Sequence, residues 1–210
     1  MLLVDISRDF QSAINQARNA LLAGGVTAFP TETFYGLGVD IRNEAAIRRL
    51  FAIKKRSDNN PILILIPSIE SLTQYVTNVP PVALRLIELF WPGGLTIVFE
   101  AKGIISPLLT AGTGNIGVRL SSHPVATTLA GAIGSAITGT SANISGEPPC
   151  QNAEEVRAFL GDKIDLILDG GKTIGGIGST ILDATTDPPR IIRQGLISAE
   201  QIKACIFNVE

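Results

Sequence analysis

Cysteine, histidine and aromatic residues are scarce in this chain, and each scarcity excludes a class of site. The 210 residues include two cysteines, one histidine and one tryptophan, and aromatic residues make up 5%. Because Cys150 and Cys205 lack CxxC spacing, we expect ordinary thiols and neither a zinc site nor a disulfide framework. The lone His123 excludes a multi-histidine metal centre. The few aromatics argue against a base-stacking platform for RNA.

Long apolar runs and an excess of positive charge are also missing. No apolar stretch reaches the roughly 18 residues of a membrane helix, and the N-terminus lacks the basic-then-apolar order of a signal peptide. We therefore expect a cytoplasmic protein without a membrane partner. The formal net charge of −2 argues against coating nucleic acid through overall charge, although a local basic cleft is compatible with it. With 45% hydrophobic residues the chain can bury one sizeable core, which predicts a single domain over residues 1–210.

Hydrophobic periodicity predicts alternating helices and strands. Helical spacing begins at Phe10 and ends at Gly24-Gly25, and Asn43 can cap a second helix that carries Lys54 and Arg56 at its end. The run 62–66 is apolar on both faces, as in a central strand covered on each side. Further strands are predicted at 26–29, 95–99, 116–120, 135–137, 164–168, 180–182 and 190–192, and further helices at 69–76, 81–90, 124–133, 153–160 and 199–205. This order indicates an α/β fold with a twisted, mixed sheet.

Two glycine-rich segments imitate nucleotide-binding motifs without meeting their requirements. Gly112–Gly117 matches GxGxxG, but a strand pattern follows it where a dinucleotide fold needs a helix, so we interpret it as a turn. Gly171-Lys172-Thr173 imitates the end of a P-loop, yet Leu166 stands where the first glycine is required. The segment Asp169–Gly178 is therefore predicted as a flexible loop, with a lid over a cleft as the alternative. Likewise, Ser141 has no obvious histidine partner for serine-hydrolase chemistry.

Two polar clusters that interrupt the apolar pattern carry more information. Lys54-Lys55-Arg56 follows the second helix, and Thr140-Ser141-Ala142-Asn143 follows an apolar segment. Cations together with small hydrogen-bonding side chains suit a phosphate site. Taken singly, the first cluster is better explained as a solvated helix end, and the second as a turn supported by side chains. A third segment, Pro30-Thr31-Glu32-Thr33, presents polar side chains just beyond a strand end, where ligand clefts form.

These segments, in their order along the chain, closely resemble the YrdC-like family. Three further segments share the resemblance: Trp91-Pro92-Gly93, Val118-Arg119 and Ile192-Arg193-Gln194-Gly195. It extends from about Phe10 to Gly195 and implies an α/β, twisted open mixed sheet with helices on both faces and a large basic cleft. It also implies threonylcarbamoyl-AMP synthase activity, in which L-threonine, bicarbonate and ATP give a carbamoyl adenylate and pyrophosphate for tRNA threonylcarbamoyladenosine modification.

The resemblance also implies roles for individual residues. Lys54 and Arg56 are expected to be catalytic, as cations near the phosphates. The residues expected to contact ATP are Arg56, Asn60, Asn115, Ser141, Asn143, Pro149 and Arg193. Those expected to contact L-threonine are Thr33, Arg119, Gly139 and Ser179. Mg²⁺ is expected on the triphosphate through water and phosphate oxygens, without a direct protein ligand. The implied partners are downstream tRNA threonylcarbamoyl transferase proteins and a contact with tRNA or double-stranded RNA.

Three positions depart from the family pattern. Ser57 replaces a common proline, Gly139 replaces a common small residue, and Leu65 stands where some relatives carry a histidine at the threonine pocket. Leu65 leaves open whether the pocket keeps its preference for threonine. Two alternatives therefore stay open: a double-stranded RNA- or tRNA-binding, ribosome-associated protein without synthase activity, and a relative that performs another nucleotide reaction.

Overall fold

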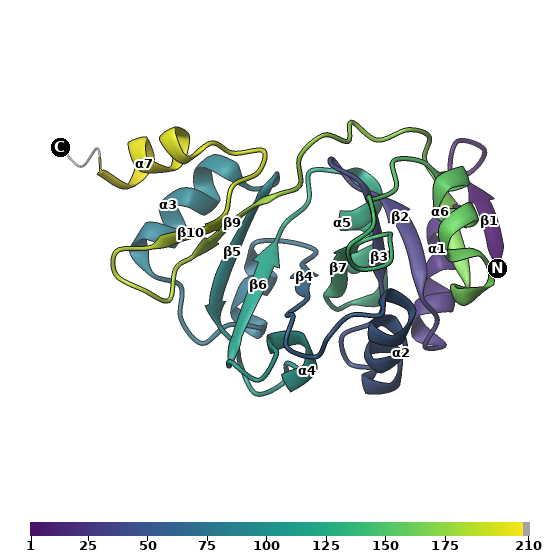
Figure 1. Cartoon of the computed structure of the whole chain (residues 1–210), viewed down its shortest axis with the longest axis horizontal. Coiled ribbons are helices and arrows are strands. Elements are labelled where there is room, and N and C mark those ends of the chain that lie inside the picture. Colours follow the sequence, from purple (N-terminus) through teal and green to yellow (C-terminus); the bar gives the residue numbers. More distant parts are fainter. Residues whose placement is uncertain (208–210) are drawn as a thin grey trace.

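Ten strands form one continuous sheet (Figure 1) within residues 1–207, the part of the chain that this computed structural model describes. In spatial order they are β1 (Leu2–Asp5), β8 (Leu166–Asp169), β2 (Thr27–Pro30), β3 (Tyr35–Gly38), β7 (Ile137–Ser141), β4 (Leu63–Leu65), β6 (Asn115–Arg119), β5 (Leu95–Glu100), β9 (Thr180–Asp183) and β10 (Arg190–Arg193). The pairs β1/β8, β8/β2, β4/β6 and β5/β9 are parallel, and the other neighbours are antiparallel. The predicted mixed sheet is therefore confirmed.

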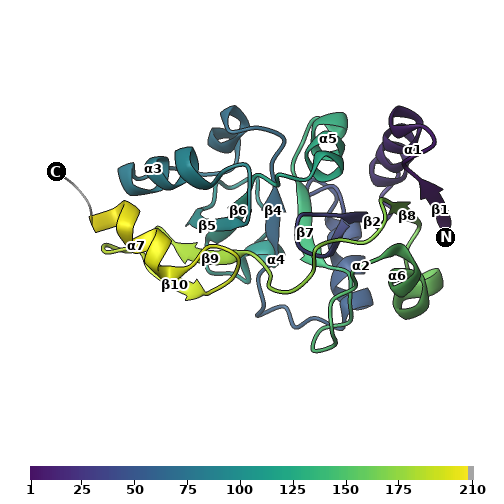
Figure 2. The ribbon, with the colours of Figure 1, turned by 90° about the horizontal axis from the view of Figure 1, so that it is seen from above.

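Helices cover both faces of the sheet. α1 (Phe10–Leu22) and α5 (Pro124–Ile133) lie on one side of β2 and β8, and α2 (Glu44–Lys54) and α6 (Ala153–Leu160) lie on the other (Figure 2). Buried apolar side chains likewise form two clusters, one on each side of β2 and β8. Ile14 and Leu129 pack with Phe29 in the first, and Leu50 and Val156 belong to the second. The remaining helices are α3 (Pro81–Phe90), α4 (Pro107–Thr110), α7 (Ala199–Phe207) and the 3₁₀ helices η1 (Glu70–Gln74) and η2 (Gly161–Lys163).

Side-chain caps fix the helix starts that the sequence predicts. The Asp9 carboxylate accepts a hydrogen bond from the Ser12 N–H (2.9 Å) at the start of α1, and the Asn43 side chain accepts one from Ala46 (3.0 Å) at the start of α2. The helices predicted at 81–90, 124–133 and 153–160 have those bounds, and α3 and α5 both begin with proline. Helix positions in this chain are thus set largely by local signals.

Several elements differ from the prediction. β7 spans Ile137–Ser141 rather than 135–137, because Ser135 follows the left-handed cap Gly134 while the polar residues at 138–141 pair with β3 and β4. The predicted helix at 69–76 is only the 3₁₀ helix η1. β1, β3 and α4 were not predicted. β3 carries two glycines, a residue depleted in strands, but a Cβ at Gly38 would lie 2.7 Å from Phe29 Cε1, so the close approach requires glycine there.

Alternation along the central strands defines the face that carries the site. Ile64 on β4 and Val118 on β6 belong to the larger apolar core. Their sequence neighbours Leu65 and Arg119 therefore point to the opposite face, where they stand side by side in the parallel β4/β6 register. A cationic side chain is in this way placed beside an apolar one on a face that carries a cavity.

Candidate active site

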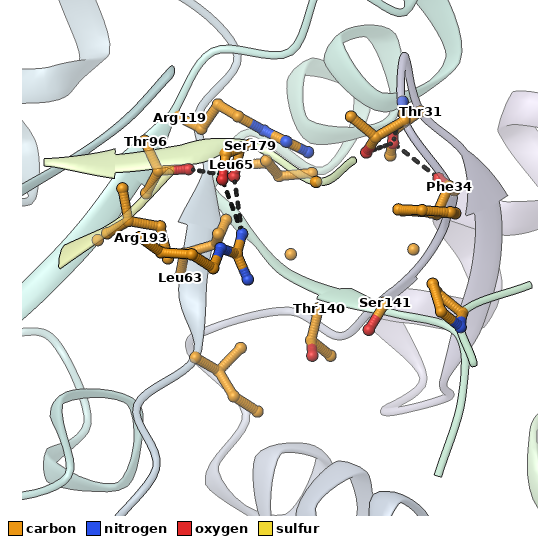
Figure 3. A pocket seen from close by; sticks show the side chains of 18 of the residues that line it. Thr31, Phe34, Leu63, Leu65, Thr96, Arg119, Thr140, Ser141, Ser179 and Arg193 are labelled. Atoms are coloured by element: carbon orange, nitrogen blue, oxygen red, sulfur yellow. Dashed lines mark hydrogen bonds between the residues drawn. The ribbon is translucent and has the colours of Figure 1, made fainter. Parts of the chain in front are cut away.

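A cavity of about 570 Å³ opens on this face of the sheet. Figure 3 shows Arg119, Arg193 and Leu65 on one side of it and Thr31 and Phe34 on the other. Its lining consists of Thr31, Thr33, Phe34, Tyr35, Gly36, Arg56, Pro61, Ile62, Leu63, Leu65, Thr96, Val98, Gly117, Arg119, Gly139, Thr140, Ser141, Pro149, Gly176, Ile177, Gly178, Ser179, Ile181, Ile192 and Arg193. The lining therefore contains three arginines, several hydroxyl groups and no carboxylate. It forms a basic cleft, as the resemblance implies.

The end of α2 sends Lys54 and Arg56 in different directions. Lys55 between them adopts a left-handed conformation (φ 49°), with its N–H bonded to the Ala52 carbonyl and the Arg56 N–H bonded to the Phe51 carbonyl. Lys54, the last residue of α2, is buried, with 1% of its surface exposed, and does not line the cavity. Arg56 does line it. The two cations were expected together at the phosphates, but only Arg56 lines the cavity, and Lys54 lies buried beneath it.

Lys54 holds the loop that carries the second polar cluster. Its Nζ donates to the Ser141 carbonyl (2.5 Å), the Asn143 carbonyl (2.8 Å) and Asn143 Oδ1 (3.2 Å). Ser141 Oγ also donates to Asn143 Oδ1 (2.6 Å), and Asn143 Nδ2 donates to the Glu147 carbonyl. These three acceptors match the three N–H donors of an ammonium group. Lys54 and Asn143 thereby fix Ser141, the member of the cluster that faces the cavity.

Two of the three arginines of the cavity, Arg56 and Arg193, are held by backbone carbonyl groups, and the arginines repel one another. Arg56 donates from Nε to the Asn60 carbonyl (3.0 Å) and from Nη2 to the Pro61 carbonyl (2.7 Å), and Arg193 Nη2 donates to the Ser179 carbonyl (2.8 Å). Burial, reinforced by repulsion from Arg193, lowers the pKa of Arg56. Burial with repulsion from Arg119 lowers the pKa of Arg193. An anion entering the cavity would relieve this repulsion.

Arg119 has a carboxylate for a neighbour rather than carbonyl groups. Its Nη1 lies 3.5 Å from Glu32 Oε1, with side-chain exposures of 7% and 12%. Burial lowers the pKa of Arg119, and the charge of Glu32 acts in the opposite direction. Glu32 Oε2 accepts a short hydrogen bond from Ser121 Oγ. Glu32 was not among the predicted site residues, although it lies in the polar segment after β2.

The glycine-rich segment 170–179 joins β8 to β9 (Figure 1), and its residues 176–179 line the cavity. The Tyr35 hydroxyl donates to the Gly171 carbonyl (2.8 Å) and accepts from the Gly170 N–H (3.0 Å), and the Gly175 N–H donates to the Thr33 carbonyl (2.7 Å). Burial raises the pKa of Tyr35 to about 12. The loop was predicted over Asp169–Gly178; Asp169 instead ends β8, and the rest has no helix or strand. Hydrogen bonds tether it to β3 and to the turn between β2 and β3.

The structure brings most, but not all, of the predicted site residues to the cavity. Those that line it are Thr33, Arg56, Arg119, Gly139, Ser141, Pro149, Ser179 and Arg193. The others are Lys54 and Asn143, which support the 141–147 loop, Asn60, whose carbonyl holds Arg56, and Asn115, at the opposite end of β6 from Arg119. Sequence reasoning missed Thr96, whose Oγ1 lies 2.9 Å from Ser179 Oγ. Strand alternation from the buried Ile97 could have placed Thr96 on this face.

The remaining sequence features have structural explanations. Gly112 and Gly114, with positive φ angles, form the turn before β6. His123 caps α5, where its Nδ1 accepts from the Val125 N–H (3.3 Å), and Cys150 and Cys205 form no disulfide. Burial raises the pKa of Cys150 to about 11, which leaves it a thiol. None of the helices within residues 1–207 combines the length and the apolar composition of a membrane span.

The polar groups that line the cavity can be compared with the oxygen ligands that Mg²⁺, the metal implied by the resemblance, prefers. Mg²⁺ prefers carboxylate, phosphate and water oxygens, but the cavity lining offers hydroxyl and carbonyl groups without a carboxylate. Within residues 1–207, no cluster of three or more histidine, cysteine, aspartate and glutamate side chains could hold a metal ion. The residues present therefore fit a cation that arrives on phosphate oxygens rather than one bound by the protein alone.

Comparison with known proteins places the fold in a family. The model of the Sua5/YciO/YrdC family, described as telomere recombination, matches residues 19–195. A threonylcarbamoyl-AMP synthase of Bacillus subtilis (strain 168) is 39% identical over 194 residues, which cover 92% of this chain and 56% of that protein. Another, from Vibrio parahaemolyticus, is 37% identical over 182 residues, 86% of this chain and 97% of that protein.

Solved structures agree with the sequence relatives. The crystal structure of P. abyssi Sua5 complexed with L-threonine superposes with a TM-score of 0.92 at 35% identity, covering 99% of this chain and 61% of that one. The chain thus spans only somewhat more than half of the B. subtilis and P. abyssi proteins. The match over residues 19–195 and these identities confirm the predicted relationship: the chain belongs to the Sua5/YciO/YrdC family.

Proposed function

We propose that this chain is a threonylcarbamoyl-AMP synthase that uses L-threonine, bicarbonate and ATP. The observation that carries the proposal is a single cavity lined by Arg56, Arg119 and Arg193 together with Ser141 and Thr33, without a carboxylate. Such a lining suits substrates that bring phosphate and carboxylate groups. The relatives named threonylcarbamoyl-AMP synthase support it, and the V. parahaemolyticus protein, matched over 97% of its length, has that name without a large additional region.

The reaction needs positioning and charge stabilisation more than a protein nucleophile. The threonine amine attacks the carbon of bicarbonate and a water leaves, which gives a carbamate. A carbamate oxygen then attacks the α-phosphorus of ATP, the bond to the β-phosphate oxygen breaks, and pyrophosphate leaves with the negative charge. Cationic groups aimed at the phosphate oxygens stabilise that charge as it develops. Mg²⁺ on the phosphates would supply further charge neutralisation.

The residues divide between the two substrates in this proposal. Arg56 and Arg193 contact phosphate oxygens, and Ser141 contacts the nucleotide with Asn143 and Lys54 fixing its loop. Arg119 binds the threonine carboxylate through two parallel hydrogen bonds, beside Thr33, Ser179 and the close backbone at Gly139. Asn60 acts by holding Arg56, and Pro149 adds a contact to ATP within the cavity. A cytoplasmic location and handover to tRNA threonylcarbamoyl transferase proteins belong to the same proposal.

An exchange assay with a matched pair of variants tests this function. Purified protein should exchange pyrophosphate into ATP only when L-threonine and bicarbonate are both present. Arg193→Ala should reduce that exchange by about a hundredfold or more, in line with the loss of one charge-stabilising donor. Arg190→Ala, at the exposed start of the same strand and outside the cavity, should leave it within about twofold. Exchange that does not depend on threonine would refute the proposal.

The RNA-binding alternative makes the opposite prediction with the same cavity. A phosphate backbone bound at Arg56 and Arg193 would give strongly salt-dependent binding. Double-stranded RNA or tRNA that binds equally well at saturating ATP, in a protein without exchange activity, would favour that alternative. Complete competition by ATP would count against a separate RNA site.

A further inference from the structure

Two buried polar atoms beside the cavity lack hydrogen-bond partners among the described residues. They are Arg119 Nε and Glu32 Oε1, which belong to the two members of one ion pair. Nearly all buried polar atoms in folded proteins are paired, so such exceptions need an explanation. The Nη1–Oε1 distance of 3.5 Å is also longer than the 2.7–2.9 Å that is usual, roughly, for a charge-assisted hydrogen bond. The pair is close enough to attract but is incompletely bonded.

Glu32 is nevertheless firmly placed. Its other carboxylate oxygen accepts the short hydrogen bond from Ser121 Oγ, and the same Oγ accepts from the His123 N–H (3.1 Å). Thr127 Oγ1 donates to the Ser121 carbonyl (2.8 Å), which ties this loop to the first turn of α5. The carboxylate is thus anchored on its far side, away from the guanidinium. This anchoring fixes the negative charge against which Arg119 is oriented.

Arg119 has donors to spare. A guanidinium carries five N–H donors in a planar fork, and the ion pair with Glu32 engages only the Nη1 end of it. Arg119 lines the cavity, whereas Glu32 does not. Figure 3 shows the guanidinium of Arg119 directed across the cavity toward Thr31. A ligand carboxylate can therefore use the free donors while Glu32 remains behind.

We propose that Glu32 is a positioning residue for amino-acid recognition, which acts through Arg119 and is itself held by Ser121. Glu32 offsets part of the cost of burying the guanidinium charge and sets the plane of the guanidinium, so that the fork faces the carboxylate of the incoming amino acid. The long pair shortens when that carboxylate binds, as site hydrogen bonds often tighten only in the complex. The identity of the amino acid rests on the proposed function; the orientation of Arg119 by Glu32 does not.

Three variants and one control test this role. Glu32→Gln keeps the shape of the side chain and removes its charge, Glu32→Asp keeps the charge, and Ser121→Ala releases the carboxylate from behind. Asp40→Asn is the matched control, because Asp40 is a buried carboxylate paired with Arg42 (2.7 Å) outside the cavity. Calorimetric titration should measure the affinity for L-threonine and for L-threonine amide, which lacks the carboxylate, and steady-state kinetics should give KM for threonine and for ATP.

The expected pattern separates positioning from general loss of structure. Glu32→Gln should weaken threonine binding by about tenfold to a hundredfold, as for the loss of a hydrogen bond to a charged group, and should reduce the preference for threonine over its amide. KM for ATP should stay within about twofold. Glu32→Asp should recover part of the threonine affinity, Ser121→Ala should lose about threefold to tenfold, and Asp40→Asn should match the wild type. Unchanged or stronger threonine binding in Glu32→Gln would overturn the proposal.

A ligand-free measurement keeps this inference distinct from the proposed function. The NMR resonance of the Arg119 Nε–H should shift, and its exchange with solvent should quicken, in Glu32→Gln relative to wild type and Asp40→Asn. If the wild type bound no threonine, the synthase proposal would fail while this signal still reported on the pair. An Arg119 resonance that is identical in Glu32→Gln and wild type would refute the positioning role.

Discussion

Lys54 and Arg119 are both buried cations next to the same cavity, with 1% and 6% of their surfaces exposed. Their partners differ. Three neutral oxygen atoms surround Lys54 Nζ at 2.5–3.2 Å, whereas Arg119 has one carboxylate at 3.5 Å and an unpaired Nε. The protein therefore provides an acceptor for each N–H donor of Lys54, but not for each N–H donor of Arg119.

We interpret this difference as separating a cation that serves the fold from one that, in the proposed function, serves a ligand. A charge whose donors are all used inside the protein has none to offer, so Lys54 acts by holding the 141–147 loop in place. A charge with spare donors beside a cavity is available to an incoming anion, and the cost of leaving them unpaired is recovered when it binds. Variants that remove each cation should therefore fail in different ways.

The largest effect is expected from Arg119→Ala. Removing the guanidinium leaves Glu32 buried without a counter-ion, which should lower the free energy of unfolding by about 3–5 kcal/mol. Threonine binding should be lost. In the double variant Arg119→Met/Glu32→Gln both charges are gone, so urea denaturation should show most of the stability restored while threonine binding stays absent. A double variant as unstable as Arg119→Ala would contradict the view that these two groups form the pair.

Sequence reasoning found the cavity but could not find this pair. Arg119, Arg193 and Ser141 were predicted through the resemblance to the YrdC-like family, and they lie at strand ends that the sheet topology brings together. Glu32 meets Ser121 across 89 positions of the chain, and such a contact leaves no local pattern. The one available signal was its place in the polar segment just after β2, where its neighbour Thr33 was predicted to bind the amino acid.

A smaller effect is expected from Lys54→Met. The variant removes one donor from each of three oxygens of Ser141 and Asn143, which should cost about 1–3 kcal/mol, partly offset because a buried charge is also removed. Hydrogen exchange in residues 141–147 should quicken, and KM for ATP should rise more than KM for threonine. Lys203→Met, at an exposed position of α7, is the control and should change neither quantity. A rise confined to KM for threonine would contradict the role in the loop.

The same variant also gives a pH test. Burial, with repulsion from Arg56, lowers the pKa of Lys54 from 10.5 to about 7. Below about pH 7 the ammonium is charged in both states, so the full cost of burying it is present; above 10.5 it is neutral in both. The unfolding free energy of the wild type relative to Lys54→Met should therefore rise as the pH increases from 7 to 10.5. Urea denaturation at several pH values measures this difference, and a fall across that range would contradict the lowered pKa.

The fold was more predictable than the direction of individual side chains. Helices such as α3 and α5 begin at prolines and follow apolar spacing, so their bounds were predicted correctly. β3 was missed because glycine has a low strand propensity. The two glycines of β3 are needed for close packing against Phe29, a tertiary contact that strand propensities do not take into account. The separation of Lys54 from Arg56 was missed for a similar reason, because it depends on the left-handed backbone at Lys55.

The smallest effect is expected at that position. A non-glycine residue in the left-handed region costs about 1 kcal/mol, which glycine avoids, although glycine also gives the unfolded chain more freedom. Lys55→Gly should therefore raise the free energy of unfolding by a few tenths to about 1 kcal/mol and leave KM for ATP and threonine unchanged. Lys55→Val should do the reverse, because a β-branched side chain is strained there, and it should also disturb the ATP site by misdirecting Arg56. If Lys55→Val altered neither stability nor KM for ATP, the turn at Lys55 would not be what separates the structural cation from the one that faces the ligand.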